Sequence, residues 1–295
     1  MEAQSIVPPL VVLAGPTASG KTSLAITIAE HFNGEIICAD SRTVYKYMDI
    51  GTAKPSAEEQ ERVKHWGLDL VEPGEEFNAA MFKKYAIKKI TEIRARGKVP
   101  IIAGGTGLYV DAIIFDYKFG TAVDDTLRHR LEAMTIEQLH DHCYKNNMQL
   151  PENSLNKRYV IREIERKGLT SKRRTAPIGH SIIVGIATKK DILRTRIEHR
   201  AEQLFTNGMV EEAKMLGKKY GWNNEAMTGN IYPLVKKYIE GELSKSELQE
   251  KFVTSDWRLA KRQMTWLKRN SYILWLTLKD AEHYLSQKLV DYHNS

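Results

Sequence analysis

The eight residues from Gly15 to Thr22, GPTASGKT, have the types and spacing of a loop that binds phosphate. They match G-x-x-x-x-G-K-[ST], in which glycines let successive backbone N–H groups face phosphate oxygens. Lys21 adds a positive charge, and the Thr22 hydroxyl can bind Mg²⁺. A kinase, an ATPase and a diphosphate-consuming transferase all fit this loop. The residues expected to hold the phosphate or diphosphate group are Gly15, Pro16, Thr17, Ala18, Ser19, Gly20, Lys21 and Thr22.

Two further polar segments each follow an apolar run that is predicted to be a strand. Asp40 opens the segment 40–55, DSRTVYKYMDIGTAKP, and Thr106 lies in the segment 104–109, GGTGLY. Ligands of parallel sheets collect at the carboxyl ends of strands, so we expect both side chains at the edge that carries the phosphate loop. Taken alone, Asp40 also fits a helix cap or a metal-shell residue, and Thr106 fits a tight turn before a helix.

The elements that must position these residues alternate between strands and helices. Apolar, β-branched runs predict strands, and 3.6-residue spacing predicts helices. The expected strands are 7–14, 35–39, 99–103 and 181–187, and the first expected helices are 23–32 and 77–96. This alternation predicts an α/β fold with a P-loop NTPase-like parallel sheet core flanked by helices.

The segment from about 116 to 178 has a different, polar and basic character. Its spacing predicts helices over 126–146 and 156–167, followed by a basic linker over 171–177. We therefore expect a first part of the core over 1–115, a helical insertion domain over 116–178, and a second part of the core over 179–295. That second part should hold one strand and mostly helices.

The composition is that of an ordinary globular protein. The 295 residues are 42% hydrophobic and 27% charged, which excludes wholly disordered and fibrous classes. The only cysteines, Cys38 and Cys143, exclude a disulfide framework and a cysteine-based zinc site, and the nine histidines show no metal-ligand spacing. No apolar stretch has the length of a membrane span or the layout of a signal peptide, so we expect a cytoplasmic protein without membrane association.

The net charge of +7 is concentrated in two regions. Residues 156–174 hold eight Lys or Arg and two Glu: Lys157, Arg158, Arg162, Arg166, Lys167, Lys172, Arg173 and Arg174 against Glu163 and Glu165. The second run, interleaved with Trp257 and Trp266, contains Arg258, Lys261, Arg262, Lys268 and Arg269. Basic groups beside aromatic rings suit phosphate contacts and base stacking, which favours RNA binding. Each run alone also fits a solvated helix face.

Together these motifs resemble the bacterial-type tRNA dimethylallyltransferases, also called tRNA isopentenyltransferases or IPP transferases. The resemblance rests on the phosphate loop, the segments 40–55 and 104–109, and the segment 260–266, AKRQMTW. Further agreement lies in the segment 196–200, RIEHR, before Gly208, and in Arg158 and Arg162; the likeness runs from about residue 10 to 276. The family transfers a dimethylallyl group from dimethylallyl diphosphate to N6 of adenosine 37, the adenosine 3′ of the tRNA anticodon.

The resemblance implies a role for each motif. The phosphate loop, with Lys21 and a Mg²⁺ held through Thr22, would bind the diphosphate and stabilise it as it leaves. Asp40 would accept the proton of the adenine amine, and Thr106 would steady that amine or the bridging diphosphate oxygen. We expect a monomer that binds the anticodon stem-loop of tRNA through Asp40, Ser41, Arg42, Thr43, Thr106, Arg128, Lys157, Arg158, Arg162, Arg258, Lys261 and Arg262.

The chain departs from the family pattern at two positions. Thr228 or a neighbour stands where relatives carry an arginine thought to bind the pyrophosphate, and Arg196 and Arg200 are candidates to replace it. Thr43 replaces a frequent glutamine. The zinc module of eukaryotic relatives is absent, which favours the bacterial form. Three alternatives stay open: an isopentenyltransferase acting on free adenine nucleotide, a P-loop nucleotide or metabolite kinase, and an RNA-binding protein without activity.

Overall fold

A computed structural model of the chain describes residues 7–119, 125–166 and 173–294. The chain forms two compact units, of which the first joins Met1–Phe115 with Ala176–Ser295 and the second is Asp116–Thr175. The predicted insertion, 116–178, overlaps the second unit from residue 116 to residue 175. Lys167 and Lys172, two members of the first basic run, lie outside the described residues.

Six parallel strands form one sheet in the described part of the first unit, in the order β3-β2-β4-β1-β5-β6. The strands are β1 (Leu10–Ala14), β2 (Gly34–Cys38), β3 (His65–Trp66), β4 (Val99–Gly104), β5 (Ser181–Ile186) and β6 (Leu274–Leu276). The predicted α/β fold with a parallel sheet is confirmed. The short strands β3 and β6 were not predicted, since two or three residues leave no readable periodicity.

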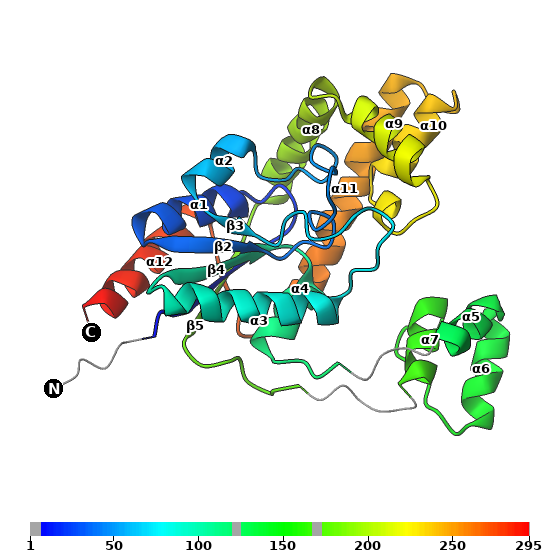
Figure 1. Ribbon diagram of the computed structural model, residues 1–295, viewed down its shortest axis with the longest axis horizontal. Coiled ribbons are helices and arrows are strands. Elements are labelled where there is room, and N and C mark those ends of the chain that lie inside the picture. The colour runs from blue at the N-terminus through cyan, green and yellow to red at the C-terminus, as the bar shows by residue number, and fades with distance from the viewer. Residues whose placement is uncertain (1–6, 120–124, 167–172, 295) are drawn as a thin grey trace. The chain divides into compact units, whose positions relative to one another are not determined.

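Helices of the first unit connect and cover these strands. They are α1 (Lys21–His31), α2 (Ala57–Arg62), α3 (Ala79–Ala95), α4 (Gly107–Ile114), α8 (Lys190–Thr206), α9 (Met209–Tyr220), the 3₁₀ helix η1 (Ala226–Thr228), α10 (Tyr232–Ile239), α11 (Lys245–Leu267) and α12 (Leu278–His293). Figure 1 shows α1 on one side of β2 and β4 and α3 on the other. None of the helices within residues 7–119, 125–166 and 173–294 combines the length and the hydrophobicity of a membrane span.

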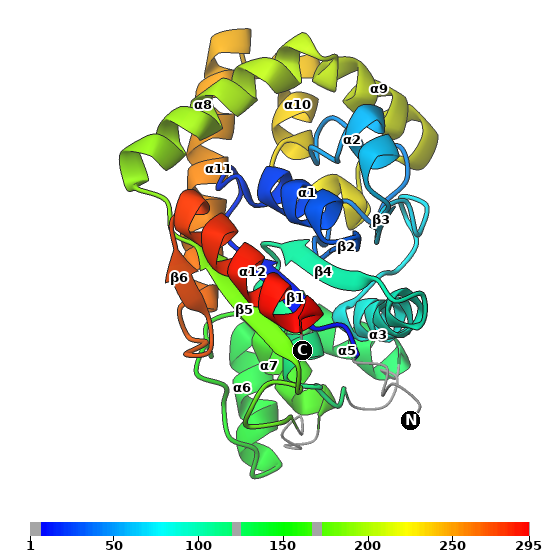
Figure 2. The same cartoon turned by 90° about the vertical axis from the view of Figure 1, so that its left-hand side faces the viewer.

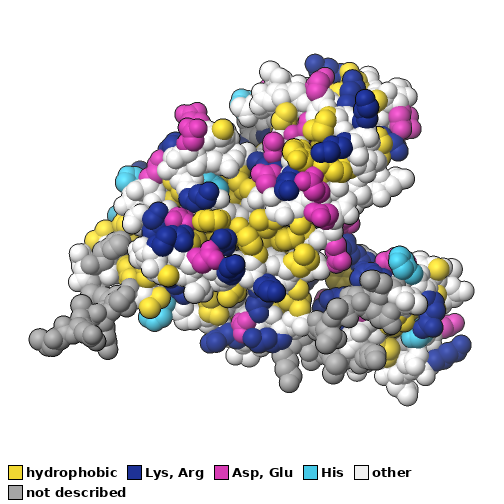
Figure 3. Space-filling view, viewed as in Figure 1, with side chains coloured by type: hydrophobic (Ala, Val, Ile, Leu, Met, Phe, Trp, Pro, Cys, Tyr) yellow, Lys and Arg dark blue, Asp and Glu magenta, His cyan; other side chains and the backbone are white. Residues whose placement is uncertain are grey.

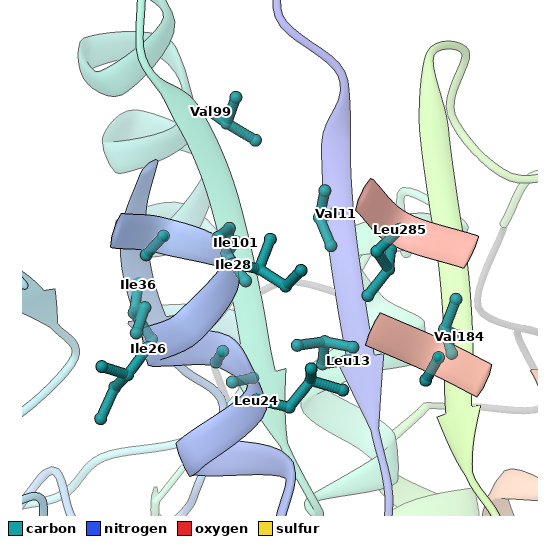
Figure 4. Packing of buried hydrophobic residues seen from close by; sticks show 14 of the residues in the cluster. Val11, Leu13, Leu24, Ile26, Ile28, Ile36, Val99, Ile101, Val184 and Leu285 are labelled. Atoms are coloured by element: carbon teal, nitrogen blue, oxygen red, sulfur yellow. The ribbon is translucent and has the colours of Figure 1, made fainter. Parts of the chain in front are cut away.

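The sheet is buried on both faces, as parallel sheets are. Every residue of β1 is fully buried. Alternate residues of β1, such as Val11 and Leu13, face α1 and α12, which lie side by side over the sheet (Figures 2 and 4). On the opposite side α3 packs against α4, where the rings of Phe82 and Tyr109 stack at 4.2 Å. The strand ends that carry polar residues are therefore fixed by packing from both sides.

A second apolar cluster of the first unit joins α9, α10 and α11 to the polar segment that follows β2. Val44, Tyr45 and Met48 of that segment are almost completely buried in this cluster, together with Tyr232 and Phe252. This packing explains how a segment of polar residues and turns holds a defined position next to the sheet.

The second unit has its own small core. Its helices are α5 (Asp125–Ala133), α6 (Ile136–Lys145) and α7 (Lys157–Glu165), packed around Leu131, Leu139, Cys143, Val160, Ile161 and Ile164. The range 126–146 is helical as predicted, but two helices rather than one cover it. Thr135 begins α6 with a capping box: its hydroxyl accepts the Gln138 N–H, and the Gln138 side chain accepts the Thr135 N–H.

Candidate active site

The carboxyl ends of β1, β2 and β4 bring together the three polar segments expected from the sequence. The end of β2 lies against that of β4, where the Ala39 N–H donates to the Ala103 oxygen at 2.8 Å. A Cβ atom on Gly104 would lie 2.1 Å from the Ala39 oxygen, so only glycine fits there. The Thr106 N–H donates to the Ala39 oxygen at 3.3 Å, and the Thr106 Oγ1 accepts the Ser41 N–H at 3.1 Å. Asp40 and Thr106 are thus held on neighbouring strand ends.

The phosphate loop has the backbone that its glycines and small residues predict. Gly20 has a φ of +88°, and Ala18 also takes a positive φ, 60°. Lys21 curls back over the loop and donates to the Pro16 oxygen at 3.1 Å. The loop runs from β1 straight into α1, which places the positive end of the α1 dipole at its base.

Two helices from far along the chain hold the outer side of this loop. The Gln263 Oε1 of α11 accepts the Thr17 N–H at 2.8 Å. On α8, Arg196 donates to the Ser19 oxygen at 3.0 Å, and one turn later the Arg200 Nη1 donates to the Thr17 hydroxyl. The loop is therefore bound by α8 and α11 as well as by its own strand and helix.

These elements surround a cavity of about 710 Å³. Of the residues expected to act on substrates, the cavity is lined by Thr17, Ala18, Gly20, Lys21, Thr22, Asp40, Ser41, Arg42, Thr43, Thr106 and Arg262. Gly15, Pro16 and Ser19 belong to the same loop without lining the cavity. The expected RNA contacts Arg258 and Lys261 lie on the exposed surface of α11, and Lys261 covers the Trp257 ring at 5.3 Å.

The pKa of Lys21 is lowered to about 8 in the folded protein. Burial is the largest cause; the charge of Arg200 lowers this pKa further, and the charge of Asp40 opposes both. A bound anion would restore the positive charge of Lys21, since an opposite charge nearby favours the ionised form. The site is therefore prepared for a strongly negative group.

This pKa predicts how anion binding depends on pH. Above about pH 8 the free protein loses the Lys21 charge, so the ratio of the pyrophosphate Kd of the wild type to that of Lys21→Arg should rise by up to about tenfold per pH unit, whereas this ratio should stay nearly flat from pH 6.5 to 7.5. Calorimetric titration between pH 6.5 and 9.5 measures this directly. Lys21→Arg keeps its charge throughout this range, so the ratio cancels the titration of pyrophosphate itself. Equal pH profiles for the two proteins would contradict it.

Arg42 and Thr43 follow Asp40 and meet different surroundings. The Asp40 Oδ1 accepts the Arg42 N–H at 2.8 Å, and the Arg42 side chain reaches η1, where it donates to the Glu225 oxygen at 2.6 Å and to the Thr228 Oγ1 at 3.1 Å. Thr228 lines the cavity; it or a neighbour was predicted to stand where relatives carry arginine. The Thr43 side chain is buried, with a hydroxyl that has no partner among the described residues.

The segment after Asp40 is fixed by one buried carboxylate. Glu212 of α9 accepts the N–H groups of Asp49, Ile50 and Gly51 at 2.8, 2.7 and 2.9 Å. The same carboxylate accepts the hydroxyl of Tyr232 at 2.8 Å. Since Gly51 lines the cavity, Glu212 sets the shape of one of its walls.

In the second unit, most of the predicted RNA contacts also make bonds within the unit. Arg128 pairs with Glu132 at 3.0 Å and with Glu165 at 3.2 Å. Arg162 pairs with Glu165 at 3.1 Å, and Lys157 donates to the Glu132 oxygen at 2.6 Å. Arg158 is exposed at the start of α7. The four basic side chains lie on α5 and α7, so the unit presents positive charge; carboxylates hold Arg128 and Arg162 in place, and the backbone oxygen of Glu132 holds Lys157.

Three cavity residues that bond to the phosphate loop, Arg196, Arg200 and Gln263, were not among the predicted site residues. Arg196 and Arg200 had been candidates only, although their four-residue spacing places both on one face of a helix. Gln263 lies inside the motif AKRQMTW, but its bond to Thr17 spans 246 residues and depends on how α11 packs. Trp266 of the same motif donates to Asp111 at 2.7 Å and packs against Gly107, so it fixes α4 to α11.

The residues present fit a Mg²⁺ ion held mainly by a phosphate ligand. Thr22 is exposed at the start of α1, lines the cavity, and its hydroxyl has no protein partner among the described residues. Within the same residues there is no group of three or more His, Cys, Asp or Glu that could hold a metal. One hydroxyl ligand completed by phosphate oxygens and water is the coordination that Mg²⁺ prefers.

Comparisons with known proteins identify the family of the chain. The family described as IPP transferase matches residues 43–270. A tRNA dimethylallyltransferase from Acetivibrio thermocellus is 38% identical, covering 94% of this chain and 97% of the relative. The crystal structure of a tRNA isopentenylpyrophosphate transferase from Bacillus halodurans has a TM-score of 0.74 at 32% identity, covering 97% of this chain and 98% of that one. A tRNA isopentenylpyrophosphate transferase from Staphylococcus epidermidis has a TM-score of 0.71 at 31% identity, over 96% and 99%. The chain is therefore an enzyme of the IPP transferase family.

Proposed function

We propose that the protein transfers a dimethylallyl group from dimethylallyl diphosphate to N6 of adenosine 37 in tRNA and releases pyrophosphate. One observation carries the proposal: a single cavity has the phosphate loop on one wall and Asp40 with Thr106 on another. A diphosphate leaving group and an acceptor amine can therefore meet inside it. Family membership and relatives that act on tRNA support the same reaction.

The phosphate loop side of the cavity serves the leaving group. An allylic diphosphate ionises readily when the charge that grows on its oxygens is stabilised. Lys21, the N–H groups of the loop and the arginines of α8 supply fixed positive charge at that place. Mg²⁺ held by Thr22 would neutralise part of the diphosphate charge.

Asp40 serves the nucleophile. The exocyclic amine of adenine is a poor nucleophile, because its lone pair is delocalised, and it gains reactivity when a base takes its proton as the N–C bond forms. One oxygen of Asp40 accepts the Arg42 N–H, and the other has no hydrogen-bond partner among the described residues. That oxygen is the proton acceptor in our proposal. Thr106, bonded to Ser41, would steady the amine or the bridging diphosphate oxygen.

The target adenine must leave the stack of the anticodon loop to enter the cavity, as in other enzymes that modify bases. We propose that the segment 40–43 and the second unit hold the anticodon stem-loop. Lys and Arg side chains are exposed on both compact units (Figure 3), which supports phosphate contacts from each. We further propose a monomer that acts on tRNA in the cytoplasm.

Mass analysis of the tRNA product tests the proposed function. Protein incubated with dimethylallyl diphosphate, Mg²⁺ and unmodified tRNA should add one dimethylallyl mass to the anticodon-loop fragment that contains adenosine 37. AMP that accepts the group while tRNA does not would identify the enzyme as one acting on free nucleotide. Release of ADP from ATP would identify a kinase. Binding of tRNA without any transfer would leave an RNA-binding protein.

The basic helix α7 gives a separate prediction on tRNA affinity. Replacing Arg158 and Arg162 with alanine should weaken tRNA binding. It should also reduce the steepness with which the logarithm of the tRNA association constant falls with the logarithm of the salt concentration, by roughly 0.7–0.9 per lost phosphate contact. Filter binding from 50 to 300 mM salt measures the slope, and the affinity for dimethylallyl diphosphate should not change. Lys279→Ala, an exposed lysine of α12, is the control. An unchanged slope in the double variant would remove α7 from the RNA contact.

A further inference from the structure

Asp256 of α11 is a buried acid with no assigned role. Its side chain is 4% exposed, yet it lines the cavity that holds the phosphate loop. The Asp256 Oδ1 accepts the Asn230 side-chain N–H at 3.1 Å. Asn230 follows η1, so this bond joins α11 to the segment that carries Thr228.

The second oxygen of Asp256 faces Arg200. The Asp256 Oδ2 lies 3.9 Å from the Arg200 Nε, which is too long for a hydrogen bond, and both atoms are buried without another partner among the described residues. Charge attraction alone joins them. The other end of the same guanidinium donates to Thr17 in the phosphate loop. Arg200 is thus held at one end by Asp256 and at the other by the loop.

The carboxylate of Asp256 lines a cavity that is expected to bind an anion, which is unfavourable unless the carboxylate has another role. Burying a carboxylate is costly unless a positive partner offsets it, and its charge would also repel a diphosphate. Arg200 is the basic side chain paired with Asp256, and its charge reaches far enough into the cavity to lower the pKa of Lys21. The arrangement makes sense if the carboxylate fixes a long, flexible cation at the phosphate loop.

We propose that Asp256, supported by Asn230, is a positioning residue that holds the Arg200 guanidinium at the phosphate loop, where Arg200 binds the diphosphate of the allylic substrate. The identity of that substrate rests on the proposed function, whereas the role of Asp256 toward an anion does not. Arg200 then supplies a positive charge in place of the family arginine, which the uncharged Thr228 cannot replace.

A double-mutant cycle tests the role of Asp256 with inorganic pyrophosphate and Mg²⁺ as the ligand. Asp256→Asn keeps the size of the side chain and removes its charge. We expect the Kd of pyrophosphate to rise about tenfold, the equivalent of about 1.4 kcal/mol, while the Kd of tRNA stays within about twofold. In an Arg200→Ala background, Asp256→Asn should have no further effect. Glu250→Gln, which removes the same charge from the exposed side of α11, should leave pyrophosphate binding unchanged.

Kinetics and a second variant separate positioning from a merely structural role. With Asp256→Asn, the KM for dimethylallyl diphosphate should rise by about the same factor, and kcat at saturation should change less. Where Asp256→Asn lowers the melting temperature strongly, Asn230→Ala replaces it in the cycle. Asn230→Ala should weaken pyrophosphate binding by about twofold to threefold, and again only when Arg200 is present.

Three results would overturn the proposal. They are an equal effect of Asp256→Asn with and without Arg200, unchanged or tighter pyrophosphate binding, and equal losses for Asp256→Asn and Glu250→Gln. A protein that shows the expected cycle but does not prenylate tRNA would refute the proposed function and support the role of Asp256. A wild-type protein that does not bind pyrophosphate would refute both.

Discussion

Asp40→Asn is expected to lower kcat by a factor of about 100 or more, with both substrates bound normally. The asparagine amide matches the shape of the carboxylate, and its oxygen can still accept the Arg42 N–H at the same place. It cannot take a proton at neutral pH, so the adenine amine would keep its proton while the N–C bond forms. Single-turnover measurement of dimethylallyl transfer to tRNA reads this step directly.

The measurement should be made near pH 7, because Asp40 also acts on Lys21. The charge of Asp40 raises the pKa of Lys21, so its loss moves that pKa below about 8. At pH 7 and saturating substrate, the effect on diphosphate binding is separated from the effect on chemistry. Asp191→Asn, on the exposed first turn of α8, is the matched control and should retain full turnover. Turnover of Asp40→Asn within threefold of wild type would exclude Asp40 as the proton acceptor.

Glu212→Ala is expected to lower the free energy of unfolding by about 3 kcal/mol or more, because it removes four hydrogen bonds at once. Three backbone N–H groups of the segment 49–51 and the hydroxyl of Tyr232 would lose their acceptor in a mostly buried place. Urea unfolding followed by circular dichroism measures the loss. Glu211→Ala, next to it on the exposed side of α9, should change the free energy by less than about 0.5 kcal/mol.

Glu212→Gln tests whether the segment needs a carboxylate or only a side chain of the same size. The glutamine oxygen can still accept hydrogen bonds, but its amide nitrogen would face donors, so the loss of stability should lie between those of Glu211→Ala and Glu212→Ala. Because Gly51 lines the cavity, the remaining folded Glu212→Gln protein should also turn over more slowly. Equal unfolding midpoints for the Glu211 and Glu212 variants would show that water satisfies the segment without the carboxylate.

The convergence of the phosphate loop, Asp40 and Thr106 could be predicted from sequence because parallel strands end at one edge of a sheet. The positions of the apolar runs were enough to predict that these three segments meet. The break between α5 and α6 also had a readable signal, the pattern of Thr135 and Gln138, which outweighs continuous helical spacing.

Other parts of the site depend on packing that leaves no local pattern. Gln263 and Arg200 reach the phosphate loop, and Asp256 reaches Arg200, only because α8 and α11 pack together through Leu193, Ile197 and Ala260. Glu212 directly follows another glutamate, Glu211, and only the fold shows which of the two is buried. Sequence motifs located the groups proposed to react, whereas the residues that hold them required the structure.

The two points where the chain leaves and re-enters the first unit are joined by a backbone bond, in which the Ile178 N–H donates to the Ile114 oxygen at 2.8 Å. The gap that the intervening segment must bridge is therefore already closed by the first unit itself. Since the entropy of closing a loop grows only slowly with its length, residues can be added or lost between these points at little cost to the sheet. Evolution can thus lengthen, shorten or reshape this inserted module, which has its own apolar core, without redesigning the catalytic framework.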